Sequence, residues 1–236
     1  MDIEFVRGNI IDIDTDAVVL PANKKLKEGS GASRAIFEAA GRKKLTEECE
    51  KVRKNDACDI GYALPSNAYD LNCQIIIHAI VPKWKDGKHG EYELLCAAYK
   101  SSLEIADKME CNSIAFPLLS SGNNGFDVNL ALEIAIETIK EHNAEALQKA
   151  IIVIYHKDIE DIIKKMGYTV SILPRKLNRK EKNQSENKQK KRVLLDKGIE
   201  FINDPRNRKM IKIVGVQIVK YFSDKIRKKI KTKNYK

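Results

Sequence analysis

Two short turns hold the residues of this 236-residue chain whose types and spacing suggest chemistry. The first is GSGAS at Gly29–Ser33, and the second is SSGNNGF at Ser120–Phe126. Glycine lets a backbone approach an anion closely and present its N–H groups to it. A helical pattern follows each turn, and the N-terminus of a helix favours negative charge. Two such turns facing each other predict a clasp around a diphosphate.

Strands and helices must alternate to position these turns. β-branched or apolar runs predict six buried strands, and periodic apolar residues predict helices between them. This alternation indicates an α/β fold, a three-layer α/β/α sandwich with a central mixed sheet, in which ligands bind at the carboxyl ends of strands. The predicted strands are IEFV near Ile3, AVVL from Ala17, IIIHAI from Ile75, SIAFPLL from Ser113, AIIVIY from Ala150 and TVSIL from Thr169, and the predicted helices are Ser33–Ala40, Lys43–Lys54, Glu91–Met109, Val128–Glu141 and Ile159–Met166.

Further sequence stretches fall in a recognisable order around the two turns. They are Gly8-Asn9-Ile10, DAVVLPAN at Asp16–Asn23, AIFEAAG at Ala35–Gly41, IIHAIVPKW at Ile76–Trp84 and IAFPLLSSGNNGF at Ile114–Phe126. With these stretches, residues of about 2–173 resemble a macro domain, the family that binds ADP-ribose and includes ADP-ribosyl hydrolases. The resemblance implies the same sandwich fold and a ligand that contains a diphosphate.

The resemblance also implies which residues contact ADP-ribose. The adenine would lie beside Tyr155, and its amino group would donate a hydrogen bond to the amide oxygen of Asn9. The first turn would wrap the distal ribose and one phosphate, the second would hold the diphosphate through backbone N–H groups, and Phe126 would pack on the distal ribose. The implied ligand-binding residues are Asn9, Ile10, Asn23, Gly29, Gly31, Ala32, Ser33, Ser121, Gly122, Asn123, Asn124, Gly125, Phe126 and Tyr155.

Two departures from the family's pattern bear on catalysis. Leu20 stands where the family has the first Asn of its Asn-Ala-Ala-Asn stretch, and Ser33 stands where hydrolytic members commonly have an Asp. Serine has no carboxylate that could take a proton near neutral pH. The implied catalytic residues are Asn23, which would orient the distal ribose, Gly31, which would shape the site, and Ser33.

Two classes of function stay open on this sequence. In the first, the protein is an enzyme that hydrolyses mono-ADP-ribosyl esters or deacetylates O-acetyl-ADP-ribose. In the second, it is a non-catalytic reader that binds ADP-ribose, a related nucleotide or an ADP-ribosylated macromolecule. Ser33 favours the second class, whereas the retained Asn23 and the glycine turn are compatible with the first.

Other candidate residues are interpreted as structural. His78 lies inside an apolar strand and is expected to be a core histidine with a hydrogen-bond partner, and Asp16 is expected to bind loop backbone. The five cysteines are odd in number and lack metal-site spacing, so neither a disulfide framework nor a metal centre is predicted. We expect no cofactor.

Charge divides the chain into a body and a tail. Residues 1–173 hold 21 Lys and Arg against 27 Asp and Glu, a net charge of −6, whereas residues 174–236 hold 22 against 6, a net charge of +16. This asymmetry predicts a macro domain at residues 1–173, a basic polar linker at 174–192 and a basic amphipathic helical extension at 193–236. The apolar stripe of the extension is Ile211, Val214, Ile218, Phe222, Ile226 and Ile230.

The stripe leaves several partners open for the basic tail. It could pack on its own domain, a second copy or another protein partner, or lie on an anionic membrane surface. Nucleic acid is less favoured because binding phosphate does not require an apolar stripe. The N-terminus lacks the regions of a signal peptide, and no run of 18 apolar residues is present, so we expect a cytoplasmic protein, membrane-peripheral if the tail binds lipid.

Overall fold

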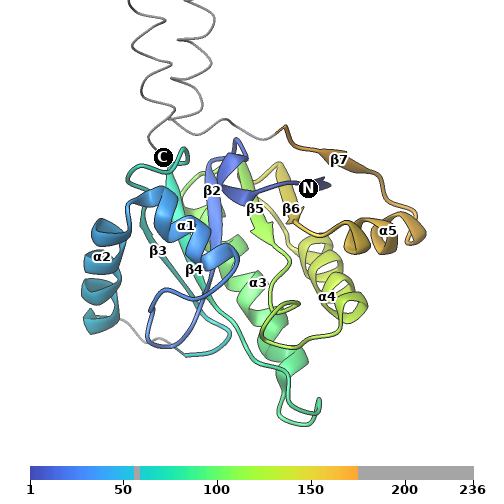
Figure 1. The fold of residues 1–236 in the computed structure, drawn as a ribbon, viewed down its shortest axis with the longest axis horizontal. Coiled ribbons are helices and arrows are strands. Elements are labelled where there is room, and N and C mark those ends of the chain that lie inside the picture. Colours follow the sequence, from blue (N-terminus) through green and yellow to red (C-terminus); the bar gives the residue numbers. More distant parts are fainter. Residues whose placement is uncertain (56–58, 175–236) are drawn as a thin grey trace, which may run out of the picture. The chain divides into compact units, whose positions relative to one another are not determined.

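The computed structural model describes residues 1–55 and 59–174, and within them the chain forms one seven-stranded sheet (Figure 1). The strand order is β3-β4-β2-β5-β6-β1-β7. Only β3 runs antiparallel to its neighbour, so the sheet is mixed, as predicted. The strands are β1 Asp2–Arg7, β2 Ala17–Ala22, β3 Ala63–Asn67, β4 Ile75–Ile80, β5 Ser113–Pro117, β6 Lys149–Ile154 and β7 Val170–Ile172.

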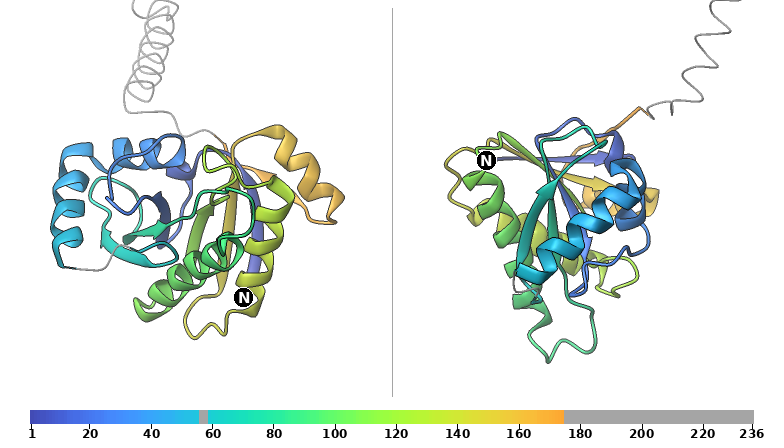
Figure 2. Two further views of the ribbon diagram at one scale, coloured as in Figure 1. Left: turned by 90° about the horizontal axis from the view of Figure 1, so that it is seen from below. Right: turned by 90° about the vertical axis from the view of Figure 1, so that its left-hand side faces the viewer.

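Helices cover both faces of the sheet and confirm the three-layer sandwich (Figure 2). One core lies between the sheet and α1 and α2, and contains Val18 and Leu20 of β2. The other lies between the sheet and α3, α4 and α5, and contains Ala17 and Val19. The helices are α1 Ala32–Ala40, α2 Arg42–Asn55, α3 Glu91–Lys108, α4 Val128–Glu141, α5 Lys157–Lys165 and the single 3-10 turn η1 Ile10–Asp12.

The central strands β2 and β5 separate toward their carboxyl ends, where the glycine turns follow them. β2 pairs with β5 only through Ala17–Ile114 and Val18–Ala115, although β2 continues to Ala22 and stays paired with β4. The carboxyl ends of β2 and β5 therefore diverge, and the loops that follow them border the opening. A divergence of this kind between parallel strands is where α/β sheets hold their ligands.

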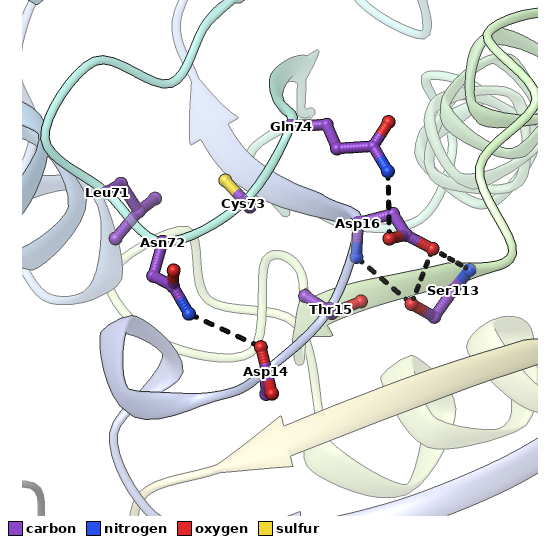
Figure 3. Close-up of a pocket in the computed structure, with 8 residues that line it drawn as sticks. All are labelled: Asp14, Thr15, Asp16, Leu71, Asn72, Cys73, Gln74 and Ser113. Carbon is purple, nitrogen blue, oxygen red and sulfur yellow. Dashed lines mark hydrogen bonds between the residues drawn. The ribbon is translucent and has the colours of Figure 1, made fainter.

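Asp16 joins the amino ends of three strands, which confirms its predicted structural role (Figure 3). One carboxylate oxygen accepts hydrogen bonds from the N–H groups of Asn112 (2.9 Å) and Ser113 (3.0 Å), and the other accepts one from the Gln74 amide (3.0 Å). Beside it lies a cavity of about 440 Å³ at the edge of the sheet opposite the glycine turns. The lining residues are Asp14, Thr15, Asp16, Leu71, Asn72, Cys73, Gln74 and Ser113.

The sequence prediction missed two elements. Strand β3 has few apolar residues and contains Pro65, which an edge strand tolerates because one side of it makes no ladder. The turn η1 forms because the Asn9 side chain accepts the N–H of Ile11. The strand expected through Leu119 ends at Pro117. The predicted linker and amphipathic extension lie outside the described residues.

His78 is a buried histidine with a hydrogen-bond partner, as predicted. It is 1% exposed, its Nε2 lies 2.7 Å from the Ser66 hydroxyl, and its Nδ1 lies 4.0 Å from the Cys49 sulfur. Burial lowers the pKa of His78 to about 4 because the apolar surroundings disfavour the charged ring. None of the helices in residues 1–55 and 59–174 is both long and apolar enough to cross a membrane.

His78 makes the folded body sensitive to acid. The unfolded chain protonates near pH 6.5 and the folded chain only near pH 4, so stability is complete above pH 6.5 and is lost as the pH falls toward 4. Lowering the pH from 7 to 5 should remove about 2 kcal/mol of unfolding free energy through this residue. Urea denaturation at both pH values measures the loss. His78→Asn, which cannot titrate, should lose correspondingly less, and equal losses in both proteins would contradict the assignment.

Candidate ligand-binding site

The residues implied as ligand contacts all lie after the carboxyl ends of four neighbouring strands, β2, β5, β6 and β1 (Figure 1). Asn23 to Ser33 follow β2, Ser121 to Phe126 follow β5, Tyr155 follows β6, and Asn9 with Ile10 follows β1. Because these strands are parallel and adjacent, segments more than a hundred residues apart in sequence line one edge of the sheet.

Hydrogen bonds join the loops at this edge. The Asn123 amide of the β5–α4 loop donates to the Ser30 hydroxyl of the β2–α1 loop at 2.7 Å. The Trp84 N–H of the β4–α3 loop donates to the Asn124 carbonyl at 2.7 Å. The two glycine turns therefore face each other across the divergence of β2 and β5, and the β4–α3 loop supports one of them.

The β5–α4 loop presents a row of unpaired backbone donors. Its closing hydrogen bonds run from the Gly125 N–H to the Gly122 carbonyl and from the Phe126 N–H to the Ser120 carbonyl. Within the described residues, the four N–H groups from Ser121 to Asn124 donate to no protein atom. A Cβ added to Gly122 would meet nothing within 4 Å. Successive free N–H groups beside open space form a nest for an anion.

The N-terminus of α1 supplies donors on the other side. Gly31 caps this helix with φ +57° and no side-chain cap, so the first-turn N–H groups stay available. Helix α4 differs because the Asp127 carboxylate already accepts the N–H groups of Asn129 (2.9 Å) and Leu130 (3.1 Å). These bonds, the one to Leu130 above all, lower the pKa of Asp127. Helix α1 is therefore the better positioned of the two to meet an anion.

Asn23 and Ser33 hold the β2–α1 loop in shape. The Asn23 amide oxygen accepts the N–H groups of Lys25 (3.0 Å) and Lys27 (3.3 Å), and its nitrogen donates to the Lys27 carbonyl (2.7 Å). The buried Ser33 hydroxyl accepts the Gly29 N–H at 3.0 Å. Leu20 is 1% exposed and belongs to the core, so this position has no access to a ligand.

At the far end, an exposed aromatic ring lies next to an amide. Tyr155 is 72% exposed, and its ring meets the His156 ring edge-on, with centroids 5.5 Å apart and planes at 84°. The Gly8 N–H donates to the Ile154 carbonyl, which places Asn9 beside Tyr155. Asn9 uses its amide oxygen on the Ile11 N–H at 3.4 Å. A ring and an amide together suit a planar base.

Comparison with known proteins identifies the architecture. The macro domain family model matches residues 19–135. An O-acetyl-ADP-ribose deacetylase of Escherichia fergusonii is 39% identical over 140 residues, which cover 59% of this chain and 78% of that protein. The chain belongs to the macro domain family. This macro domain is also similar to two solved structures.

The first structure is the Oceanobacillus iheyensis macrodomain with ADP, with a TM-score of 0.65 and 28% identity over 69% of this chain and 88% of that one. The second is the Trypanosoma brucei macrodomain in complex with ADP-ribose, with a TM-score of 0.60 and 26% identity over 70% of this chain and 68% of that one.

The sequence analysis did not single out Trp84 or Glu91. Trp84 supports the macro domain's β5–α4 loop directly, and Glu91 orders the β4–α3 loop that carries Trp84. Trp84 packs its ring against Phe126, with centroids 5.0 Å apart and planes at 67°. Phe126 is 3% exposed, so most of its ring belongs to the core. The sequence held one signal for the role of Glu91. In the segment KDGKHGEYE this acid directly follows a glycine, so its carboxylate could accept backbone N–H groups of the preceding turn.

Glu91 fixes the β4–α3 loop through hydrogen bonds to its backbone. Its buried carboxylate accepts the N–H groups of His89 (2.6 Å), Lys85 (3.2 Å) and Asp86 (3.4 Å). Burial on its own would raise the pKa of Glu91, but these backbone donors and the residue's own N–H outweigh it and lower the pKa to about 2. The carboxylate is thus charged at all physiological pH values and orders the loop that carries Trp84.

Replacing Glu91 should loosen this loop without unfolding the domain. We expect Glu91→Gln to shift the fluorescence of Trp84, the single tryptophan of the chain, to longer wavelength and to increase its quenching by acrylamide. The amide can accept with only one oxygen and lacks the charge that strengthens each bond. Glu93→Gln is the matched control, since Glu93 is exposed on the same turn of α3. Equal spectra for the two variants would contradict the role of Glu91.

Proposed function

We propose that this macro domain binds ADP-ribose along the carboxyl edge of its sheet. The diphosphate would lie between the free N–H groups of Ser121 to Asn124 and the uncapped N-terminus of α1. The Asn123–Ser30 hydrogen bond joins the two loops that carry these donors. This pair of facing donor groups is the observation that carries the proposal. The adenine would stack on Tyr155 near Asn9, and the distal ribose would lie against the β2–α1 loop.

Related structures support the identity of this ligand. The Trypanosoma brucei structure is described as a complex with ADP-ribose, and that of Oceanobacillus iheyensis as one with ADP. The present fold resembles both over more than two thirds of the chain. ADP fits the adenine and diphosphate regions, and the additional ribose of ADP-ribose would extend toward Asn23 and Gly31.

The local geometry favours binding over fast hydrolysis. The side chains of Asn23 and Ser33 both serve the loop backbone, and none of the implied ligand contacts carries a carboxylate. A general base in this class of reaction needs a group that takes a proton near neutral pH. We therefore propose a reader of ADP-ribose as the first function.

Hydrolysis is the second candidate, and one observation favours it. The chain is 39% identical to a protein named O-acetyl-ADP-ribose deacetylase over 140 residues. In this proposal the ligand's own diphosphate positions the attacking water, Asn23 orients the distal ribose, and Gly31 leaves room for the ester. Such a reaction works without a side-chain base and is correspondingly slow.

Gly122→Glu should abolish ADP-ribose binding. The new carboxylate would enter the space reserved for the diphosphate, and like charges at such a separation cost enough to weaken binding about a hundredfold or more. Gly122→Ala is the matched control, because its methyl group adds no charge and meets no protein atom within 4 Å, so it should weaken binding far less than Gly122→Glu. Calorimetric titration of the full chain measures both. Tight binding by Gly122→Glu, or none by the native protein, would sink the proposal.

A carboxylate at position 33 should turn slow hydrolysis into faster hydrolysis. Ser33→Asp keeps an acceptor for the Gly29 N–H and adds a base, which we expect to raise the turnover of O-acetyl-ADP-ribose on the order of tenfold. Ser33→Asn has nearly the same shape without a base and serves as the control. Release of acetate measures the rate. Equal rates for the Asp and Asn variants would show that a missing carboxylate does not limit the reaction.

A further inference from the structure

A cluster of exposed lysines borders one end of the proposed ADP-ribose site. The β2–α1 loop contributes two of them and the β4–α3 loop three, although the body as a whole is acidic, with 21 basic against 27 acidic residues in positions 1–173. We call this cluster, together with one exposed tyrosine, the basic rim. Its members are Lys25, Lys27, Tyr62, Lys83, Lys85 and Lys88.

The five rim lysines give these two loops an excess of positive charge. Within the described residues, none of the five forms an ion pair, whereas the neighbouring Lys24 pairs with Asp59 at 2.6 Å. The carboxylate of Glu28 is held by Arg42 at 2.7 and 3.1 Å, and that of Glu91 by backbone N–H groups. Asp86 lies between Lys85 and Lys88, and its carboxylate accepts the Lys88 N–H at 3.0 Å. The five lysines still outnumber the acids of their two loops, Glu28 and Asp86, and this excess of positive charge attracts an anion from outside the domain.

Tyr62 gives the rim an aromatic surface. Its side chain is 60% exposed, and its carbonyl accepts the Ile80 N–H at 2.9 Å, which places the residue beside the carboxyl end of β4. The Lys24–Asp59 ion pair holds the turn before Tyr62 against the β2–α1 loop. An exposed ring therefore lies at the base of both lysine-bearing loops, where a nucleobase could stack on it.

The strand order places the rim at the distal end of the ligand. Loops follow one another along the edge as β4, β2, β5, β6 and β1. If the adenine lies at Tyr155 and Asn9 after β6 and β1, the distal ribose lies toward β2 and β4. This step rests on the proposed function. Any group attached to the distal ribose would leave the site across the loops that carry the rim.

We propose that the basic rim binds the phosphate backbone of a nucleic-acid strand to which the ADP-ribose is attached. Lysines act as point charges for phosphates, and an aromatic ring among them adds base stacking. An acidic peptide would satisfy the lysines but has no use for the exposed ring of Tyr62. The combination of both features favours nucleic acid over a peptide.

The test compares acceptors on the full-length protein. The probes are free ADP-ribose, a short single-stranded oligonucleotide, the same oligonucleotide joined to ADP-ribose at the distal ribose by a non-hydrolysable linkage, and an acidic peptide joined in the same way. The rim variant is Lys83→Gln with Lys85→Gln and Lys88→Gln. Its control is Lys100→Gln with Lys108→Gln and Lys165→Gln, three exposed lysines on α3 and α5 with the same change in net charge.

We expect the native protein to bind the ADP-ribosyl oligonucleotide more tightly than free ADP-ribose. The rim variant should lose about tenfold in affinity for this conjugate. The slope of log affinity against log salt should become shallower by about 2, since three phosphate contacts disappear. Free ADP-ribose should bind both variants equally, and the control variant should behave as the native protein. Tyr62→Ala should weaken the oligonucleotide conjugate and leave the peptide conjugate unchanged.

Three results would overturn the inference. Equal affinity of free and oligonucleotide-linked ADP-ribose, or equal losses in the rim and control variants, would remove the rim while leaving ADP-ribose binding intact. A rim-dependent gain with the peptide as large as with the oligonucleotide would replace nucleic acid by an acidic peptide. Failure of the native protein to bind free ADP-ribose would overturn the proposed function and the attached acceptor together. Binding of the unmodified oligonucleotide, measured in parallel, corrects for the basic tail.

Discussion

The site depends on one constraint, the short parallel pairing between β2 and β5. Asp16 ties the start of β2 to the start of β5, so the two strands begin in register and then separate after Val18 and Ala115. The loops that follow β2 and β5 therefore leave the same edge of the sheet but are separated from each other. A single side-chain bond across 93 residues of sequence, from Asn123 to Ser30, then sets how far apart the glycine turns stand.

Side chains and backbone have different roles in the loops around the site. The polar side chains of Asn23, Ser33 and Glu91 are used on loop N–H groups. The groups left over for a ligand are mostly backbone N–H groups of the β5–α4 loop and of α1. A backbone held by its own side chains needs little rearrangement when an anion arrives, which reduces the entropy lost on binding.

The sequence predicted those parts of the fold that have a strong periodic signal. Five of the six predicted strands are buried, and they and the long helices α3 and α4 were recovered because their runs of apolar residues are long or periodic. The sixth, predicted from TVSIL, is the short edge strand β7, whose Ser171 and Ile172 are exposed, so it forms but is not buried. The edge strand β3 escaped because it is short and half polar. The site residues were assigned by resemblance and stay a prediction. The hydrogen bonds of Asn23 and Ser33 within the loop were not predicted, since they depend on the loop's path and not on residue type.

The position of β1 affects how this chain can fold. Its six residues lie near the N-terminus, yet they pair on one side with β6 at Lys149–Ile154 and on the other with β7 at Val170–Ile172. On a ribosome, β1 is therefore made long before β6 and β7, the two strands with which it pairs. Contacts of such high sequence separation close slowly, and until they form, the edge of β6 is open to pairing with other chains.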